Sequence, residues 1–182
     1  YKRKFFKIAG SIYPSDFLKI NTQFRVREES EWLNWIDGNK LASYDLQQKT
    51  ISIDLNWFKD NKHEIVLILK EWTSQKEIDV IITTGGTGLT GRDITPEAVN
   101  EIADKHIPGF GEVFRTISLK TVGTSSIQSR ACAVLANGKY IFALPGSSGG
   151  VTDAWDEILK HQLDINHKPC NFVELFPRLK EK

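Results

Sequence analysis

Apolar and polar positions along the chain predict strands and helices that follow one another. Residues 49–55 alternate apolar and polar side chains, which is typical of a half-buried strand. Residues 78–84 are nearly all apolar or β-branched, which favours a buried parallel strand. Between them, residues 62–75 predict an amphipathic helix with an inner face at Ile65, Ile68, Leu69 and Trp72. Alternating strands and helices predict an α/β fold with helices on both faces of the sheet.

The second half of the chain predicts a β-hairpin followed by a helix. Residues 130–136 and 139–144 read as strands, and Asn137-Gly138 between them favours a two-residue turn. Hairpin strands are antiparallel, so we expect a mixed sheet. After the hairpin, residues 151–163 keep an apolar stripe at helical spacing for about three turns.

Two further segments carry signals for helix ends. Thr95 is a candidate N-cap and Pro96 suits the first helical position, so a helix is expected to follow. Residues 108–111, Pro-Gly-Phe-Gly, are typical of a break in the chain, and another helix is expected over 112–119.

Length and charge bound the class of protein. The chain has 182 residues, which suits a single domain over residues 1–182, with residues 1–50 its least regular part. The net charge of +1 gives no field that would attract nucleic acid or a membrane surface. No apolar run is as long as a membrane span.

The cysteine content indicates the compartment. Cys132 and Cys170 are too few for a disulfide framework and do not have zinc-binding spacing. Two buried free thiols in a reducing cytosol are the preferred interpretation, which predicts a cytoplasmic protein. A disulfide or a reactive thiol is the alternative.

Two glycine-rich turns each follow a strand and precede a helix, at residues 85–91 and 146–150. In open α/β sheets such turns lie at the carboxyl ends of strands, where ligands bind. Backbone N–H groups at a strand end favour an anion, so residues 85–93 are a candidate phosphate or carboxylate site. Either turn alone would also be explained as a tight connection.

The first turn contains a misleading pattern. Residues 86–91 match the dinucleotide fingerprint G-x-G-x-x-G, which would suggest an oxidoreductase. In that fingerprint the third glycine lies inside the helix, whereas here a new helix signal appears four residues later, at residue 95. No strand ending in an acid follows about 20 residues on, and no glycine precedes the Lys-Ser or Lys-Thr pair of a P-loop.

Charged and hydroxyl side chains beside the turns are candidates for chemistry. Arg92 suits a phosphate, and Asp93 suits a Mg²⁺ ion bound to phosphate, although capping of the following helix would also explain Asp93. Asp60 is a second candidate acid. Ser147 and Ser148 lack a nucleophile elbow and are interpreted as donors to an anion. The histidines have no metal-binding spacing.

Six short motifs follow one another in the chain, at residues 84–88 (TGGTG), 92–98 (RDITPEA), 109–115 (GFGEVFR), 123–131 (GTSSIQSRA), 144–148 (LPGSS) and 170–175 (CNFVEL). On these motifs the sequence resembles the molybdopterin-binding family over about residues 78–179, and within it the branch named molybdenum cofactor biosynthesis protein B. Residues 22–27 depart from the family, whose members have a Val-Ser-Asp-like turn there.

The resemblance implies a structure and a set of site residues. The implied fold is a three-layer α/β/α sandwich with a mostly parallel mixed sheet, assembled as a trimer or a hexamer. Asp93 and Asp60 are the implied catalytic and magnesium-binding residues. The residues implied to hold the ligands are Gly85, Gly86, Thr87, Gly88, Arg92, Glu112, Pro145, Gly146, Ser147 and Ser148.

The resemblance also implies a function in molybdenum cofactor biosynthesis. Active members use ATP and Mg²⁺ to adenylylate molybdopterin ahead of molybdate insertion, so molybdopterin and other proteins of cofactor biosynthesis are the implied partners. A non-catalytic molybdopterin-binding or carrier protein is the alternative.

Overall fold

The structure is a computed structural model, and the description covers residues 61–76, 78–179 and 181, with the backbone of three strands at 32–36, 39–43 and 50–54. The described elements, in chain order, are β1 (Trp32–Ile36), β2 (Asn39–Ser43), β3 (Thr50–Asp54), α1 (Lys62–Ser74), β4 (Val80–Thr84), α2 (Thr95–Glu101), β5 (Lys105–His106), α3 (Pro108–Val122), the 3-10 helix η2 (Gly123–Gln128), β6 (Cys132–Ala136), β7 (Lys139–Leu144), α4 (Ser148–Ala154), the π-helical η3 (Trp155–Leu159), α5 (Lys160–Gln162) and the 3-10 helix η4 (Val173–Arg178).

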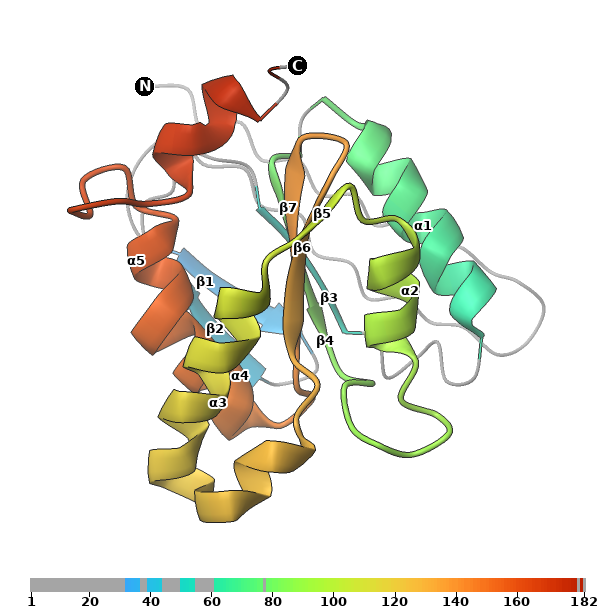
Figure 1. The fold of residues 1–182 in the computed structure, drawn as a ribbon, viewed down its shortest axis with the longest axis vertical. Coiled ribbons are helices and arrows are strands. Elements are labelled where there is room, and N and C mark those ends of the chain that lie inside the picture. The colour runs from blue at the N-terminus through green and yellow to red at the C-terminus, as the bar shows by residue number, and fades with distance from the viewer. Residues whose placement is uncertain are drawn as a thin grey trace.

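A five-stranded mixed sheet with the order β3-β4-β7-β6-β5 forms the centre of the fold (Figure 1). The pairs β3–β4 and β4–β7 are parallel, whereas β7–β6 and β6–β5 are antiparallel. Strands β1 and β2 form a separate antiparallel pair. The three parallel strands therefore end at one edge of the sheet, where β6 begins.

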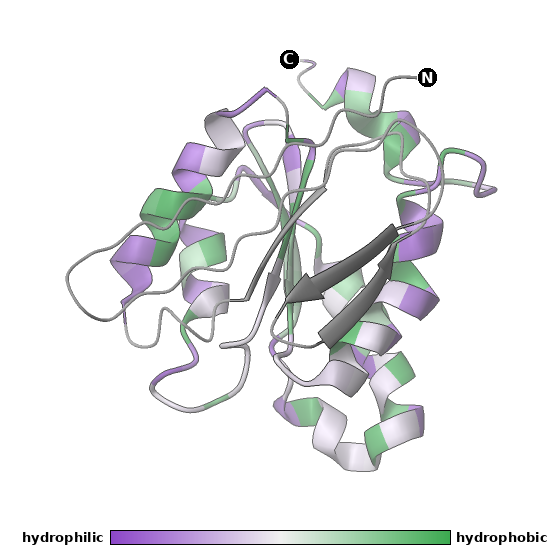
Figure 2. Ribbon diagram, turned by 180° about the vertical axis from the view of Figure 1, so that it is seen from behind, coloured by the Kyte–Doolittle hydropathy of each residue, from purple (hydrophilic) through white to green (hydrophobic). Residues whose placement is uncertain are grey.

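Helices cover both faces of this sheet, as predicted, in three layers. Helices α1 and α2 pack on one face, and α3, α4 and the segments after α4 pack on the other (Figure 1). Successive side chains of β4 enter different cores, because side chains alternate across a strand: Val80 and Ile82 join the α3 side and Ile81 the α1 side. In Figure 2 the flanking helices carry both hydrophobic and hydrophilic residues, as expected of elements with one buried face.

The predicted hairpin is confirmed. Strands β6 and β7 pair from Cys132↔Ala143 to Ala136↔Lys139. The turn residues Asn137 and Gly138 both have positive φ, 50° and 71°. Two left-handed residues match the twist of the flanking strands, which is why this dipeptide carries the signal.

Three details of the predicted elements are wrong. Thr95 is not the N-cap of α2, because it is already helical and Ile94 precedes it. Residues 108–111 do not break the chain but form the first turn of α3, since a proline is tolerated where its missing N–H would have no helical partner. The two-residue strand β5 was not predicted.

The cysteines are free thiols in the structure, as expected. Cys132 is half-buried, and burial raises its pKa to about 11, so this thiol is a poor nucleophile. The expectation of burial is wrong for Cys170, which is exposed. Among the described residues, no helix has the length and apolar character needed to cross a membrane.

The positive φ of Gly138 predicts a specific sensitivity. We expect Gly138→Ala to lower the free energy of unfolding by about 1–2 kcal/mol, because a Cβ disfavours the left-handed region. Gly109→Ala is the matched control: its Cβ would meet nothing within 4 Å and its φ is not positive, so stability should stay equal or rise. Urea unfolding of both variants measures the difference, and equal losses would contradict the explanation.

Candidate functional site

The two glycine-rich loops leave neighbouring strands at the same edge of the sheet. Thr84 and Leu144 are opposite each other at the ends of the parallel strands β4 and β7. The first residue after β4 links the two ends, because the Gly85 N–H donates to the Leu144 carbonyl at 3.0 Å. Both loops lie at the lower end of the sheet in Figure 1. The structure thus brings residues 85–93 together with residues 145–150, as the sequence predicted.

The glycines of the first loop make room for side chains of the same loop. Gly86 has a φ of 66°, and a Cβ there would lie 2.4 Å from the Thr95 hydroxyl oxygen. That hydroxyl donates to the Gly85 carbonyl at 2.8 Å. At Gly88, a Cβ would lie 2.8 Å from Asp93 Oδ2. Glycine is therefore required here by close internal packing, even without a ligand.

Asp93 is held inside its own loop. Its Oδ2 accepts hydrogen bonds from the Thr90 N–H at 2.8 Å and from the Thr90 hydroxyl at 2.7 Å. The Thr90 hydroxyl is the main cause of a lowered Asp93 pKa; desolvation opposes it, and the N–H groups of Thr90 and Gly88 and the charge of Arg130 reinforce it. Asp93 is thus an ionised carboxylate, and these bonds, rather than capping of α2, fix its place.

The backbone donors of this loop divide into two groups. The N–H of Gly85 is used by the sheet, and those of Gly88 and Thr90 are directed to Asp93. Within the described part of the chain, the N–H groups of Gly86, Thr87, Leu89 and Gly91 donate to no protein acceptor; Thr87 is buried, whereas Leu89 and Gly91 are exposed. The amides of Gly86, Leu89 and Gly91 are therefore the donors that an incoming anion could use.

The second loop leads directly into α4. Ser147 is the N-cap of that helix, and its hydroxyl oxygen accepts from the Gly150 N–H at 3.2 Å. Gly146, Ser147 and Ser148 are exposed, and Pro145 is half-buried. The loop therefore presents hydroxyl groups and backbone to solvent beside the first loop.

The remaining predicted site residues are less closely tied to this edge. Arg92 lies in the first loop and is exposed. Glu112 is exposed on α3, and among the described residues no ion pair or hydrogen bond joins its carboxylate to either loop. Asp60 lies outside the described residues, as does the departure from the family pattern at 22–27.

Two residues of this edge, Arg130 and its partner Glu97, were missed in the sequence. The Arg130 side chain donates to the carbonyls of Gly88 and Asp93 and pairs with the Glu97 carboxylate. Arg130 lies within the motif at 123–131, but its contacts are 33 to 42 residues away along the chain. Only the motif itself could have drawn attention to it.

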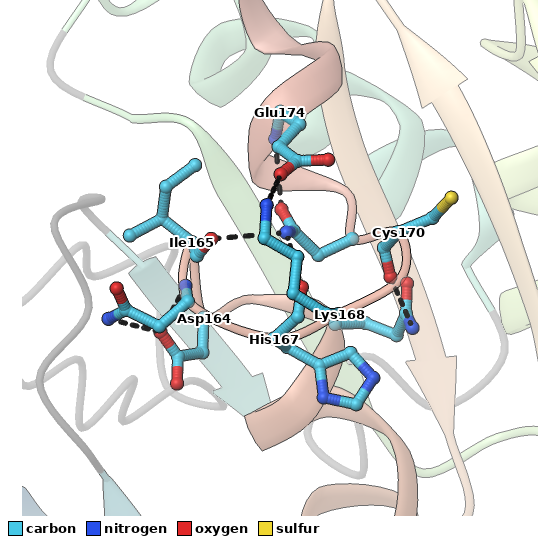
Figure 3. A network of polar contacts seen from close by, with 9 residues as sticks. Asp164, Ile165, His167, Lys168, Cys170 and Glu174 are labelled. Carbon is cyan, nitrogen blue, oxygen red and sulfur yellow. Dashed lines mark hydrogen bonds and ion pairs between the residues drawn. The ribbon is translucent and has the colours of Figure 1, made fainter.

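The motif at 170–175 lies at the other end of the fold, where it stabilises the structure through a network of polar contacts (Figure 3). The buried Asn171 donates to the carbonyls of Ile165 and His167 at 3.3 and 3.0 Å, and accepts from the Glu174 N–H at 2.9 Å. This network places Phe172 against the aromatic rings of β7. In the part of the chain that is described, no group of three or more His, Cys, Asp or Glu side chains could hold a metal ion.

Comparison with known proteins identifies similar sequences and structures. The family model described as "Probable molybdopterin binding domain" matches residues 39–165. The chain is 43% identical over 129 residues to molybdenum cofactor biosynthesis protein B of Escherichia coli strain K12, covering 71% of this chain and 74% of that protein. The protein of the same name from Staphylococcus aureus strain Mu50 is 48% identical over 107 residues, which are 58% of this chain and 63% of that protein.

Solved structures agree with this result. A crystal structure of molybdenum cofactor biosynthesis protein B has a TM-score of 0.59 at 36% identity, covering 68% of this chain and 71% of that chain. The tungsten cofactor synthesizing protein MoaB from Pyrococcus furiosus has a TM-score of 0.50 at 40% identity, covering 54% of this chain and 63% of that chain.

The Thr90–Asp93 contact predicts how Asp93 titrates. Thr90→Val removes the hydroxyl and keeps the backbone N–H, so we expect it to raise the pKa of Asp93, measured by NMR titration of the carboxyl carbon. Thr90→Ser, which keeps the hydroxyl, should leave the pKa close to that of the wild type. An unchanged pKa in Thr90→Val would show that this contact does not control Asp93.

The same contact links stability to pH. Because the folded-state pKa of Asp93 lies below the unfolded-state value, the carboxylate contributes stability above the unfolded-state pKa. That contribution is lost as the pH falls through the folded-state pKa. Thr90→Val should therefore be less stable than the wild type at neutral pH, and urea unfolding should show the deficit shrinking as the pH falls through this range.

Proposed function

Because this chain belongs to the family of molybdopterin-binding domains, we propose that it acts in molybdenum cofactor biosynthesis, binding molybdopterin and transferring an adenylyl group to it from Mg-ATP. The observation that carries the proposal is the junction of two glycine-rich loops at one edge of the sheet, beside an ionised aspartate. The Gly85–Leu144 hydrogen bond joins the loops, and Asp93 lies in the first of them. Two neighbouring loops suit a reaction between two anionic substrates.

The proposed reaction is nucleotidyl transfer. A phosphate oxygen of molybdopterin attacks the α-phosphorus of ATP, the bond from that phosphorus to the oxygen bridging to the β-phosphorus breaks, and pyrophosphate leaves with the electron pair. The barrier lies mainly in holding two anions in line and in balancing their charge. The protein therefore needs positioned donors and a place for the magnesium ion.

The described residues are suited to these tasks. The N–H groups of Gly86, Leu89 and Gly91 would hold one phosphate, and the exposed loop at 146–148 would contact the other ligand. Both hydrogen bonds from Thr90 go to Oδ2 of Asp93, and Oδ1 is the oxygen that we propose for a cation. Mg²⁺ that arrives with a nucleotide takes one or two carboxylates and completes its shell with phosphate and water oxygens. Asp93 would be one such ligand, and we propose Asp60 as a second.

A non-catalytic molybdopterin carrier is the second candidate. One observation favours it: the N–H groups of Gly85, Gly88 and Thr90 are already engaged, so the loop offers few donors for a nucleotide as well as a pterin phosphate. A carrier needs only one anion subsite, and Asp93 would then serve the loop rather than a metal ion.

We expect Asp93→Asn to lower the rate of adenylyl transfer by at least about 100-fold, since the amide is a poor magnesium ligand. The assay follows radiolabelled AMP transferred from ATP to molybdopterin by the purified protein. Asp156→Asn, which removes a half-buried carboxylate that pairs with Lys160 on the segment after α4, is the charge-matched control and should keep the full rate. Full activity of Asp93→Asn would refute the metal-binding role.

Calorimetry separates the two candidate functions. The transferase should bind both molybdopterin and ATP, and ATP binding should require Mg²⁺ because the nucleotide phosphates and the Asp93 carboxylate repel one another without it. The carrier should bind molybdopterin alone, with no heat from ATP in the presence or absence of Mg²⁺. If the protein binds no molybdopterin, both candidate functions are refuted.

A further inference from the structure

Arg130 holds the first loop at several points. The residue lies between η2 and β6, and 32% of its side chain is exposed. Its Nε donates to the Gly88 carbonyl at 2.7 Å, and its Nη2 donates to the Asp93 carbonyl. Its own backbone N–H donates to the Thr87 carbonyl at 2.9 Å. Arg130 thus binds the loop at Thr87 and Gly88 and again at Asp93.

These contacts fix the shape of the loop. The guanidinium is planar and its N–H groups have fixed directions, so two donors on one fork set the separation of the two carbonyls that they bind. Gly88 lies against the Asp93 carboxylate, and the fork lies against the carbonyls of the same two residues. A change in the fork would therefore move the carboxylate relative to the amides of the loop.

Glu97 holds the fork in place. Its carboxylate pairs with Arg130 Nη1, and it projects from α2, which begins after the loop. Desolvation opposes ionisation of Glu97, but the hydrogen bond and charge of Arg130 prevail and lower its pKa. The guanidinium is thus anchored to a helix on one side and to the loop on the other.

We propose that Arg130 is a positioning residue: its fork, anchored by Glu97, sets where Asp93 presents its carboxylate to the metal-bound nucleotide. The inference about geometry stands on the contacts of Arg130, and its role in catalysis rests on the proposed function. Arg130 acts through Asp93 and touches no reacting atom in this proposal.

The first test measures Asp93 without any activity assay. Arg130→Lys keeps the positive charge and loses the fork, whereas Arg130→Gln loses both. We expect both variants to raise the pKa of Asp93 in an NMR titration and to speed hydrogen exchange of the Gly88 and Thr90 amides. Arg178→Lys, the same change at an exposed arginine paired with Glu181, should alter neither.

The outcomes of this test decide the geometry. If the pKa of Asp93 is that of the wild type in Arg130→Lys and is raised only in Arg130→Gln, the charge of Arg130 alone is responsible and the positioning role is overturned. Glu97→Gln keeps the inference testable if the Arg130 variants do not fold, because Glu97 is exposed and its carboxylate pairs with the fork. Glu97→Gln should raise the pKa of Asp93 by a smaller amount than the Arg130 variants do. An unchanged pKa would overturn the role of Glu97 as the anchor.

The second test measures adenylyl transfer. We expect Arg130→Lys to lower kcat by about 10- to 100-fold with the KM for Mg-ATP changed by less than about twofold, because misplacement acts on the transition state. A raised Asp93 pKa with an unchanged kcat would overturn the role of Arg130 in catalysis. If the wild type transfers no AMP but Arg130→Lys still alters Asp93, the proposed function fails and the positioning of Asp93 by Arg130 stands.

Discussion

The parallel pairing of β4 with β7 is the constraint on which the site depends. Parallel neighbours end at the same edge of a sheet, so the loops after Thr84 and Leu144 emerge side by side. Strand β6 runs in the opposite direction, and the segment before it therefore starts at this edge. The mixed sheet thus brings Arg130, at the start of an antiparallel strand, to the loop that follows a parallel one. An all-parallel sheet would place a residue that precedes a strand at the opposite edge.

Local signals explain why much of the fold could be predicted. The turn at Asn137-Gly138, the continuous apolar run of β4 and the helical spacing of α1 each depend on neighbours in sequence. Where two local effects compete, the prediction was wrong. A proline both ends one helix and suits the first turn of the next, and at Pro108 it begins α3. The Thr95 hydroxyl, expected to cap α2, instead donates to Gly85, so a tertiary contact took precedence over the local preference.

The candidate site was predictable only in part, for a related reason. Gly86, Gly88 and Asp93 belong to one loop, and two motifs, at 84–88 and 92–98, contain them. The motifs did not show that these residues pack closely within the loop. The missing Cβ atoms of Gly86 and Gly88 make space for the Thr95 hydroxyl and the Asp93 carboxylate. Arg130 reaches Gly88 across 42 residues of sequence. A contact of that kind is set by the order and direction of strands, which no local pattern specifies.

The loop already contains an anion of its own, and this limits what it can bind. The N–H groups that keep Asp93 ionised cannot also serve a phosphate, whereas the amides of Gly86, Leu89 and Gly91 have no protein acceptor in the described part of the chain. A phosphate held by those amides meets a fixed negative charge within the same loop, and two like charges at short range repel each other strongly. A cation between them converts the repulsion into attraction. Because Arg130 is already committed to backbone carbonyls and to Glu97, its positive charge is partly balanced before any ligand arrives. A phosphate that brings its own divalent cation would avoid the repulsion from Asp93 that a phosphate without one would meet, and this is the physical argument for the proposed magnesium nucleotide.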